Sequence, residues 1–193
     1  MSFLKKNYGW LIVVLLATLP LLPIVNLTLD NGKQNIDMLY HISGEFAIRW
    51  MTAVLTATPF FILFGVNNLF VRQAMGIATA LWSVIHFAFF IWAEGLLETF
   101  TQFNYIAGFI AVLILFPLFF TSNRKSMKWL KSKWKKLQSL SYLAIILSLL
   151  HVAILEKTWL IYAVIVGLGF ILRLPIIKEK IISTRQKSIR AQN

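Results

Sequence analysis

Long apolar stretches separated by short polar connections run through the whole chain. Six of them approach the roughly 20 apolar residues that a membrane-spanning helix needs. They cover 9–27, 45–64, 74–91, 105–120, 140–155 and 159–177. The pattern predicts an all-α polytopic membrane protein, a bundle of six transmembrane helices, whose first helix bends near Pro20 and Pro23. No internal repeat is apparent, and no Gly/Ser-rich linker divides the chain.

Basic residues gather in every second connection. Lys5 and Lys6 precede the first stretch, Arg72 lies between the second and third, seven basic residues lie between the fourth and fifth, and five follow the sixth. Loops on the cytoplasmic side of a membrane carry an excess of Lys and Arg. Both termini are therefore expected in the cytoplasm.

Composition agrees with this prediction. The 193 residues are 59% hydrophobic and 13% charged, with a formal net charge of +12, whereas soluble domains are about 45–50% apolar and about 25% charged. Nucleic acid is not expected as a partner, because the membrane topology accounts for the basic excess. The chain has no Cys, which excludes disulfides, thiolate metal sites and covalently attached haem.

The basic connection at 121–136 contains Trp129 and Trp134 among lysines. This mixture is typical of a short helix that lies on anionic membrane lipid, and docking of an acidic cytoplasmic partner is the alternative. With a basic tail at 178–193, the connection belongs to a single transmembrane domain that fills the chain.

Two histidines fall within predicted spans. His86 lies 14 residues after Arg72 and His151 lies 15 residues after Lys136, about 21 and 22 Å from the cytoplasmic boundary at the rise of an α-helix. Imidazoles at one depth on neighbouring helices can ligate a non-covalent b-type haem from both faces. Two serines three residues before the histidines, Ser83 and Ser148, leave space for a flat cofactor.

The same residues have a simpler interpretation. Small residues let helices pack closely, and each His can hydrogen-bond to a Ser or to a backbone carbonyl of a neighbour. A zinc site is less favoured, because catalytic zinc normally takes three protein ligands and no third His or acid lies at this depth.

Three more polar residues lie near the predicted spans. Arg49 suits a haem propionate, and an i,i+4 ion pair with Glu45 is an equal alternative. His41 is expected at the membrane surface, where it could hydrogen-bond a propionate or a quinone head group or stay solvated in a loop. Arg173 is expected to extend its side chain to the cytoplasmic interface.

Three segments carry a resemblance to a known family. They are His41-Ile-Ser-Gly44 followed by Arg49, the run from Arg72 to His86 with its Gly76 and Trp82, and the run from Trp134 to Tyr142 that leads to His151. With these segments the chain resembles the ferric reductase-like transmembrane family, and within it the haem-binding membrane subunits of bacterial methionine-sulfoxide reductase systems. The similar core covers about 41–177.

The resemblance implies an electron-transfer subunit of the bacterial inner membrane that is not itself catalytic. It would pass electrons from a cytoplasmic flavin reductase or the quinone pool to a periplasmic, molybdopterin-containing methionine-sulfoxide reductase. His86 and His151 match the family's haem ligands. Where the family usually has a further His in the fifth span, this chain has Gln138, a poor haem ligand. One haem b is therefore expected. Either FMN or quinone would bridge the inner half of the membrane, or quinol would deliver electrons nearer the outside.

Two other functions fit a chain of this kind. A stand-alone transmembrane reductase would use the same haem to reduce ferric iron or another small oxidant directly. A haem-free transporter or assembly protein is less favoured, because the spans contain few charges and no evident inverted repeat.

Overall fold

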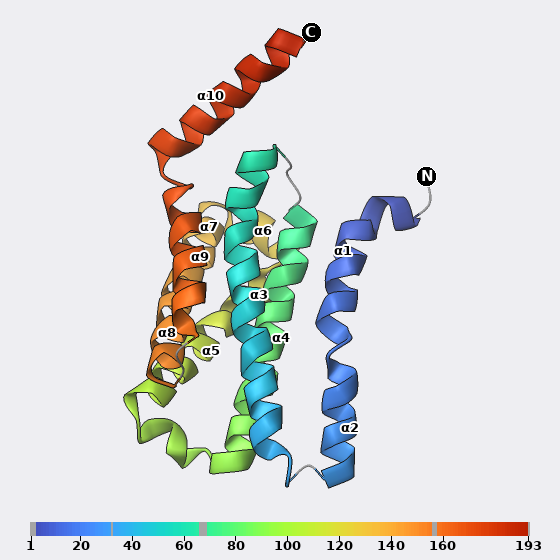
Figure 1. Cartoon of the computed structure of the whole chain (residues 1–193), viewed down its shortest axis with the longest axis vertical. Helices are drawn as coiled ribbons and strands as arrows, with labels where there is room; N and C mark the ends of the chain where they lie inside the picture. Colours follow the sequence, from blue (N-terminus) through green and yellow to red (C-terminus); the bar gives the residue numbers. More distant parts are fainter. Residues whose placement is uncertain (1–2, 32, 66–68, 156–157, 193) are drawn as a thin grey trace.

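The computed structural model describes residues 3–31, 33–65, 69–155 and 158–192, which contain helices and no strand. The all-α membrane architecture is thereby confirmed (Figure 1). The helices are α1 (Phe3–Thr18), α2 (Leu21–Asn31), α3 (Ile36–Phe64), α4 (Leu69–Glu94), the 3₁₀ helix η1 (Leu97–Phe100), α5 (Phe103–Thr121), α6 (Arg124–Leu130), α7 (Ser132–Gln138), α8 (Leu140–Leu155), α9 (Trp159–Ile171) and α10 (Pro175–Gln192).

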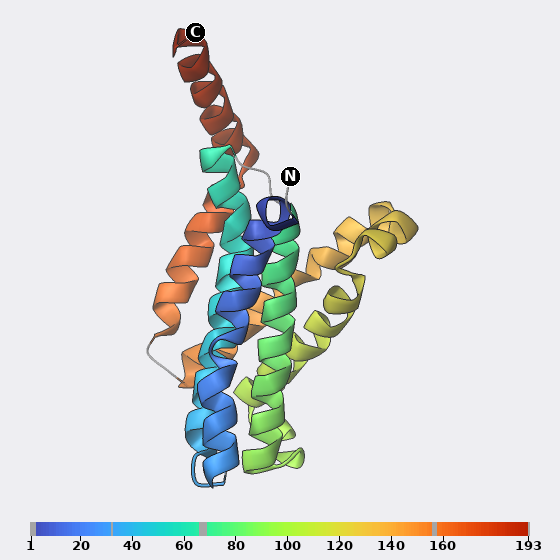
Figure 2. The same cartoon turned by 90° about the vertical axis from the view of Figure 1, so that its right-hand side faces the viewer.

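Five segments of the described chain are long and apolar enough to cross a membrane. They are α3, α4, α5, the combined α1 and α2, and the combined α7 and α8. Helices α9 and α10 make a sixth only if they are counted as one span bent by 70°. The predicted span at 159–177 thus covers α9, this bend and the first residues of α10. Pro175 lacks an N–H and disfavours helical backbone at Leu174, so α9 ends at Ile171 and α10 leaves the bundle (Figure 2).

Two antiparallel helix pairs form the centre of the molecule. One pair is α3 with α4 and the other is α5 with α8, and α4 also contacts α5. Helix α1 packs on α4, α9 packs on α3, and the short helices α6 and α7 project from the side of the bundle (Figure 2). Helix α10 and the start of α1 lie at the same end of the molecule (Figure 1). We call this end, which also holds α6 and α7, the basic end.

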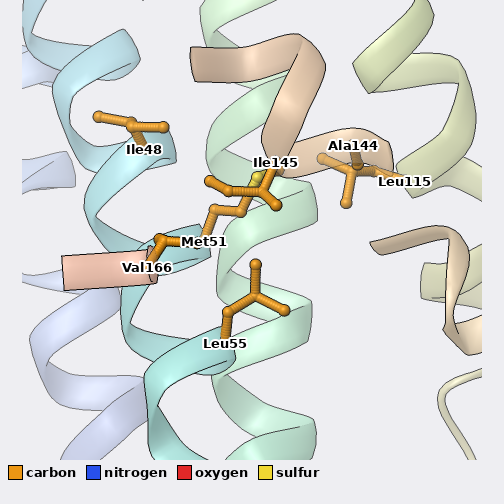
Figure 3. Packing of buried hydrophobic residues seen from close by; sticks show 7 residues of the cluster. All are labelled: Ile48, Met51, Leu55, Leu115, Ala144, Ile145 and Val166. Atoms are coloured by element: carbon orange, nitrogen blue, oxygen red, sulfur yellow. The ribbon is translucent and has the colours of Figure 1, made fainter. Parts of the chain in front are cut away.

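A buried apolar cluster joins the two pairs. Its members come from α3, α5, α8 and α9 (Figure 3): Ile48, Met51, Leu55, Leu115, Ala144, Ile145 and Val166. Lipid is as apolar as these side chains, so close packing rather than exclusion from water holds such helices together. Ala144 and Ile145 have no exposed surface, which shows how closely α8 approaches its neighbours.

The first span is attached to α4 at a helix break. Helix α1 ends at Thr18, just before Pro20, as the predicted bend requires. The break leaves the Ala17 carbonyl without its helical donor, and the indole N–H of Trp82 donates to it at 3.1 Å. An unsatisfied carbonyl in lipid costs several kcal/mol, so this contact stabilises the α1–α4 packing.

Arg173 satisfies a second orphaned carbonyl. Pro59 interrupts the hydrogen bonding of α3 because it has no N–H for the carbonyl of Leu55, four residues earlier. A guanidinium Nη of Arg173 donates to this carbonyl instead, and the other donates to the hydroxyl of Tyr142 at 2.6 Å. The guanidinium of Arg173 thus bridges α3 and α8, and the expectation that it extends to the cytoplasmic interface stays a prediction.

Candidate cofactor site

The two intramembrane histidines meet inside the bundle. His86 of α4 and His151 of α8 have ring centres 6.2 Å apart, and their ring planes are inclined by 67°. Their common depth, predicted by counting residues from the basic boundaries, is confirmed by this contact. Their role as cofactor ligands stays a prediction at this point.

Each imidazole is oriented by a backbone carbonyl. Nδ1 of His86 lies 2.9 Å from the Tyr40 carbonyl oxygen of α3, and Nδ1 of His151 lies 2.8 Å from that of Asn104 in α5. A carbonyl oxygen only accepts, so Nδ1 is the protonated nitrogen in both rings and each Nε2 keeps its lone pair. The hydrogen-bonding interpretation and the metal-ligand interpretation are therefore compatible, because they use different nitrogens.

A glycine makes each of these contacts sterically possible. Gly44 and Gly108 each stand one helical turn after the carbonyl that the imidazole approaches, on the same helix face. A Cβ added at Gly44 would lie 3.0 Å from Cε1 of His86, and one at Gly108 would lie 3.0 Å from Nδ1 of His151. Any side chain at either position would displace its imidazole.

A largely apolar cavity surrounds the two rings, and we call it the histidine cavity. Ser83, Ser148 and His41 line it, as does Glu45. The predicted space beside the histidines is thus present. His41 stacks on the ring of Tyr40, with centres 4.9 Å apart, and lies within α3 rather than in the expected surface loop.

The two helix pairs line the histidine cavity with equivalent positions. Six cavity-lining positions of α3 recur in α5 exactly 64 residues later, and four of α4 recur in α8 65 residues later. The first set is 41, 44, 45, 47, 48 and 51 with 105, 108, 109, 111, 112 and 115; the second is 83, 86, 87 and 90 with 148, 151, 152 and 155.

The chain therefore contains an internal repeat, contrary to the sequence-based expectation. The pattern Ser-x-x-His-x-Ala occurs at Ser83 and again at Ser148, and Ile-Ser-Gly44 corresponds to Ile-Ala-Gly108. Sequence reasoning missed Gly108 and Asn104 for the same reason. Few residues match, and they are dispersed among apolar residues that any span would contain. The fixed spacing between the two sets was the available signal.

Arg49 forms the ion pair that was predicted as the alternative to a haem propionate contact. Its guanidinium pairs with the Glu45 carboxylate one turn earlier, and its side chain is 57% exposed. Glu45 lines the histidine cavity, whereas Arg49 is not among the residues that do so. The i,i+4 pair is confirmed, and contact of Arg49 with a propionate stays a prediction.

The histidine geometry fits a haem iron. A metal bound between two imidazoles through Nε2 separates the ring centres by about 6 Å, since each metal–nitrogen bond is about 2 Å and each nitrogen lies roughly 1 Å from its ring centre. The observed 6.2 Å agrees. No three His, Asp or Glu residues of the described chain gather as a metal site. The pair thus suits an iron whose other ligands come from a macrocycle.

A second cavity lies towards the basic end, and we call it the inner cavity. Gly76, Thr79 and Gln138 line it. The amide nitrogen of Gln138 donates to the hydroxyl of Thr121 at 3.2 Å and to the Leu118 carbonyl at 3.4 Å. Gln138 is thus held by protein groups at the position where a His was expected in relatives.

Comparison with known proteins agrees with this arrangement. The family described as "Ferric reductase like transmembrane component" matches residues 43–149, which include His86 and both glycines and end two residues before His151. Comparison with solved structures finds no match.

Three curated relatives carry the name "Protein-methionine-sulfoxide reductase heme-binding subunit MsrQ". The Agrobacterium fabrum protein is 30% identical over 163 residues, which are 78% of this chain and 76% of that protein. The Brucella ovis and Brucella canis proteins are each 30% identical over 154 residues, 74% of this chain and 70% of theirs. The chain therefore belongs to the ferric reductase-like transmembrane family.

Proposed function

We propose that this protein is the haem-binding, electron-transfer subunit of a methionine-sulfoxide reductase system in a bacterial inner membrane. The observation that carries the proposal is the pair of imidazoles, 6.2 Å apart in an apolar cavity with both Nδ1 atoms bound to backbone carbonyls. The relatives named as heme-binding subunits support it.

The residues around the histidine cavity have separate roles in holding the haem. A b-type haem, when bound, supplies one-electron transfer. His86 and His151 would hold its iron, and the Tyr40 and Asn104 carbonyls, which fix the two rings, would make each Nε2 a stronger donor to it. The relatives named as subunits of a methionine-sulfoxide reductase support transfer of electrons to a partner protein over direct reduction of a small oxidant.

The rim of the histidine cavity offers groups for the haem propionates. Arg49 and His41 lie on α3 near this rim, and we propose that they hold a propionate through N–H donors. Arg49 itself does not line the cavity, but its ion-pair partner Glu45 does. Ser83 and Ser148 keep the walls thin enough for the flat ring to enter.

The proposed electron path runs from the basic end outwards. The Lys and Arg content of the basic end favours a cytoplasmic location for this end and for both termini. In this proposal the family core is 41–177, the cytoplasmic loop is 121–136 and the tail is 178–193. The donor is a cytoplasmic flavin reductase or the quinone pool, and the acceptor is a periplasmic molybdopterin-containing reductase. Gln138 cannot serve as an iron ligand like His, so we propose one haem, with FMN or quinone in the inner half.

The test is the reduced-minus-oxidised absorption spectrum of the purified protein, with haem measured per chain. The wild type is expected to show the spectrum of a six-coordinate b-type haem at about one per chain. His86→Ala and His151→Ala should each lose it, because either change leaves the iron one protein ligand.

Trp129→Ala is the matched control, since Trp129 on α6 is 81% exposed and lies outside both cavities. This variant should keep the spectrum. A colourless wild type from cells supplied with haem, or full haem content in either His variant, would contradict the proposal.

A further inference from the structure

The two carbonyls that orient the imidazoles belong to residues with very different side chains. Tyr40 of α3 and Asn104 of α5 occupy equivalent positions, 64 residues apart. The Tyr40 ring packs against the rings of His41 and His86. Asn104 is only 2% exposed, and its Nδ2 donates to no group of the described chain. Any residue supplies a carbonyl, so the contact with His151 does not explain an asparagine here.

Thr99 of η1 is a second buried donor without a partner. It is 1% exposed and lines the histidine cavity, and its hydroxyl makes no hydrogen bond within the part of the chain that the structure describes. Thr79 is equally buried, but its hydroxyl donates to the Met75 carbonyl of its own helix at 2.9 Å. A buried polar group without a partner is costly. The Thr99 hydroxyl and the Asn104 amide are therefore expected to donate to a bound group.

The N-terminus of α5 adds backbone donors beside these two side chains. The N–H of Ile106 donates to the Gln102 carbonyl at 3.1 Å, so the N–H groups of 103–105 precede the first acceptor within the helix. The Gln102 side chain does not cap this end, and the first turn of α5 has no acidic residue. The end lies at the edge of the histidine cavity, because Tyr105 lines it. Such an N-terminus attracts an anion.

The other wall of the histidine cavity has a different helix start. Phe103, where α5 begins, corresponds to Leu39, and α3 begins three residues earlier, at Ile36. The first turn of α3 contains Asp37, whose carboxylate already matches the positive end of that helix. The unfilled anion site therefore belongs to α5 and η1.

We propose that Thr99, Asn104 and the N-terminus of α5 bind one carboxylate of the haem, the propionate on the α5 side of the histidine cavity. The hydroxyl and the amide supply neutral donors, and the helix N-terminus supplies a positive potential. The inference deepens the proposed function and rests on it. The other propionate is left for Arg49 and His41 on α3.

This placement fixes how the haem is oriented in the histidine cavity. Helix η1 and the start of α3 lie at the end of the molecule opposite the basic end (Figure 1). Both carboxylates are therefore held towards that end, and the apolar edge of the ring faces the interior of the bundle. Asn104 acts on two parts of the cofactor, since its carbonyl orients an iron ligand and its amide holds a carboxylate.

Reconstitution of the full-length apoprotein in detergent with two porphyrins tests the proposal. Haem b has two free propionates, and its dimethyl ester has the same ring and iron without the charges. We expect the wild type to bind haem b roughly 10-fold or more tightly than the ester. The absorption spectrum of each complex shows whether both histidines hold the iron.

Thr99→Val and Asn104→Leu each remove a donor and nearly keep the side-chain size, and Asn104→Leu keeps the backbone carbonyl that orients His151. Each should weaken haem b binding roughly 5- to 10-fold and affect the ester much less. Thr99→Ser retains the hydroxyl and should behave as the wild type. Thr52→Val is the matched control, because Thr52 is buried with an unpartnered hydroxyl but lies outside the described lining of both cavities. It should leave both affinities unchanged.

Two results would overturn the inference. One is an equal loss of affinity for haem b and for the ester in Thr99→Val and Asn104→Leu, which would assign these side chains to packing. The other is unchanged haem b affinity in both variants. Either result in a protein that still binds haem b through both histidines contradicts this inference alone. A wild type that binds neither porphyrin contradicts the proposed function as well.

Discussion

The α3–α4 and α5–α8 pairs line the histidine cavity with equivalent positions, and the residues that contact the imidazoles match whereas those at the rim and beyond it differ. Each supplies one Ser-x-x-His-x-Ala pattern, one glycine and one carbonyl. At the cavity rim, Glu45 corresponds to Phe109, and on the neighbouring turn Arg49 corresponds to Leu113. Pro59, which breaks the hydrogen bonding of α3, corresponds to Asn123, beyond the end of α5.

The matching and the differing positions meet two different structural requirements. A flat ligand clamped from both faces needs two equivalent walls, so the residues that hold it recur. The rim and the helix ends face different neighbours, so there each pair has its own residues. Changes at equivalent positions should therefore have equal effects, and changes at the differing positions should affect one pair only.

The largest effects are expected at the two glycines. Gly44→Val and Gly108→Val each place a branched side chain where an added Cβ already lies 3.0 Å from an imidazole atom. Overpacking of this kind costs about 1–3 kcal/mol, so haem affinity should fall roughly 5- to 150-fold. Haem per chain, measured after purification at limiting haem, checks this.

Gly167→Val is the control, because nothing lies within 4 Å of a Cβ built at Gly167 of α9. This variant should keep its haem. A loss confined to one of the two cavity glycines would show that the walls are not equivalent.

An intermediate effect is expected at the Pro59 break of α3. Arg173→Met should destabilise the protein by about 1–3 kcal/mol, because the buried Leu55 carbonyl loses its donor. In a Pro59→Ala background the new Ala N–H can donate to this carbonyl, so the same Arg173→Met change should cost less. Unfolding of the four proteins in detergent with increasing SDS gives the coupling between the two positions. Equal costs in both backgrounds would exclude this role for Arg173.

The smallest effect is expected at the rim. Arg49→Gln removes a positive charge near the proposed propionate and should lower the haem midpoint potential by on the order of 10–60 mV, up to tenfold in the reduction equilibrium. Haem content should not change, since exposed ion pairs contribute about 0–1 kcal/mol. Leu113→Gln, at the equivalent position of α5, is the control and should leave the potential unchanged. A redox titration that finds no shift for Arg49→Gln would contradict a contact between Arg49 and a haem propionate.

Much of the fold and half of the site were accessible from the sequence. The lengths of the apolar stretches predicted the membrane spans. Counting residues from the basic boundaries predicted that His86 and His151 lie at the same depth. The break before Pro175 was not predicted because apolar residues continue through it, so hydropathy conceals the effect of the proline. The contact of Arg173 with the Leu55 carbonyl was missed. Pro59 leaves this carbonyl without its helical donor, and no residue pattern marks which side chain will donate instead.

Met51 of α3 and Leu115 of α5 line both the inner cavity and the histidine cavity and lie at the boundary between them. Both side chains are apolar and buried, so this boundary offers no side-chain group to carry a proton. An electron that passes it moves charge without a compensating ion, and one charge crossing a 100 mV membrane potential corresponds to about 2.3 kcal/mol. Across a membrane that is negative inside, outward electron flow is downhill. The resting potential of the cell would therefore help to drive the proposed repair reaction.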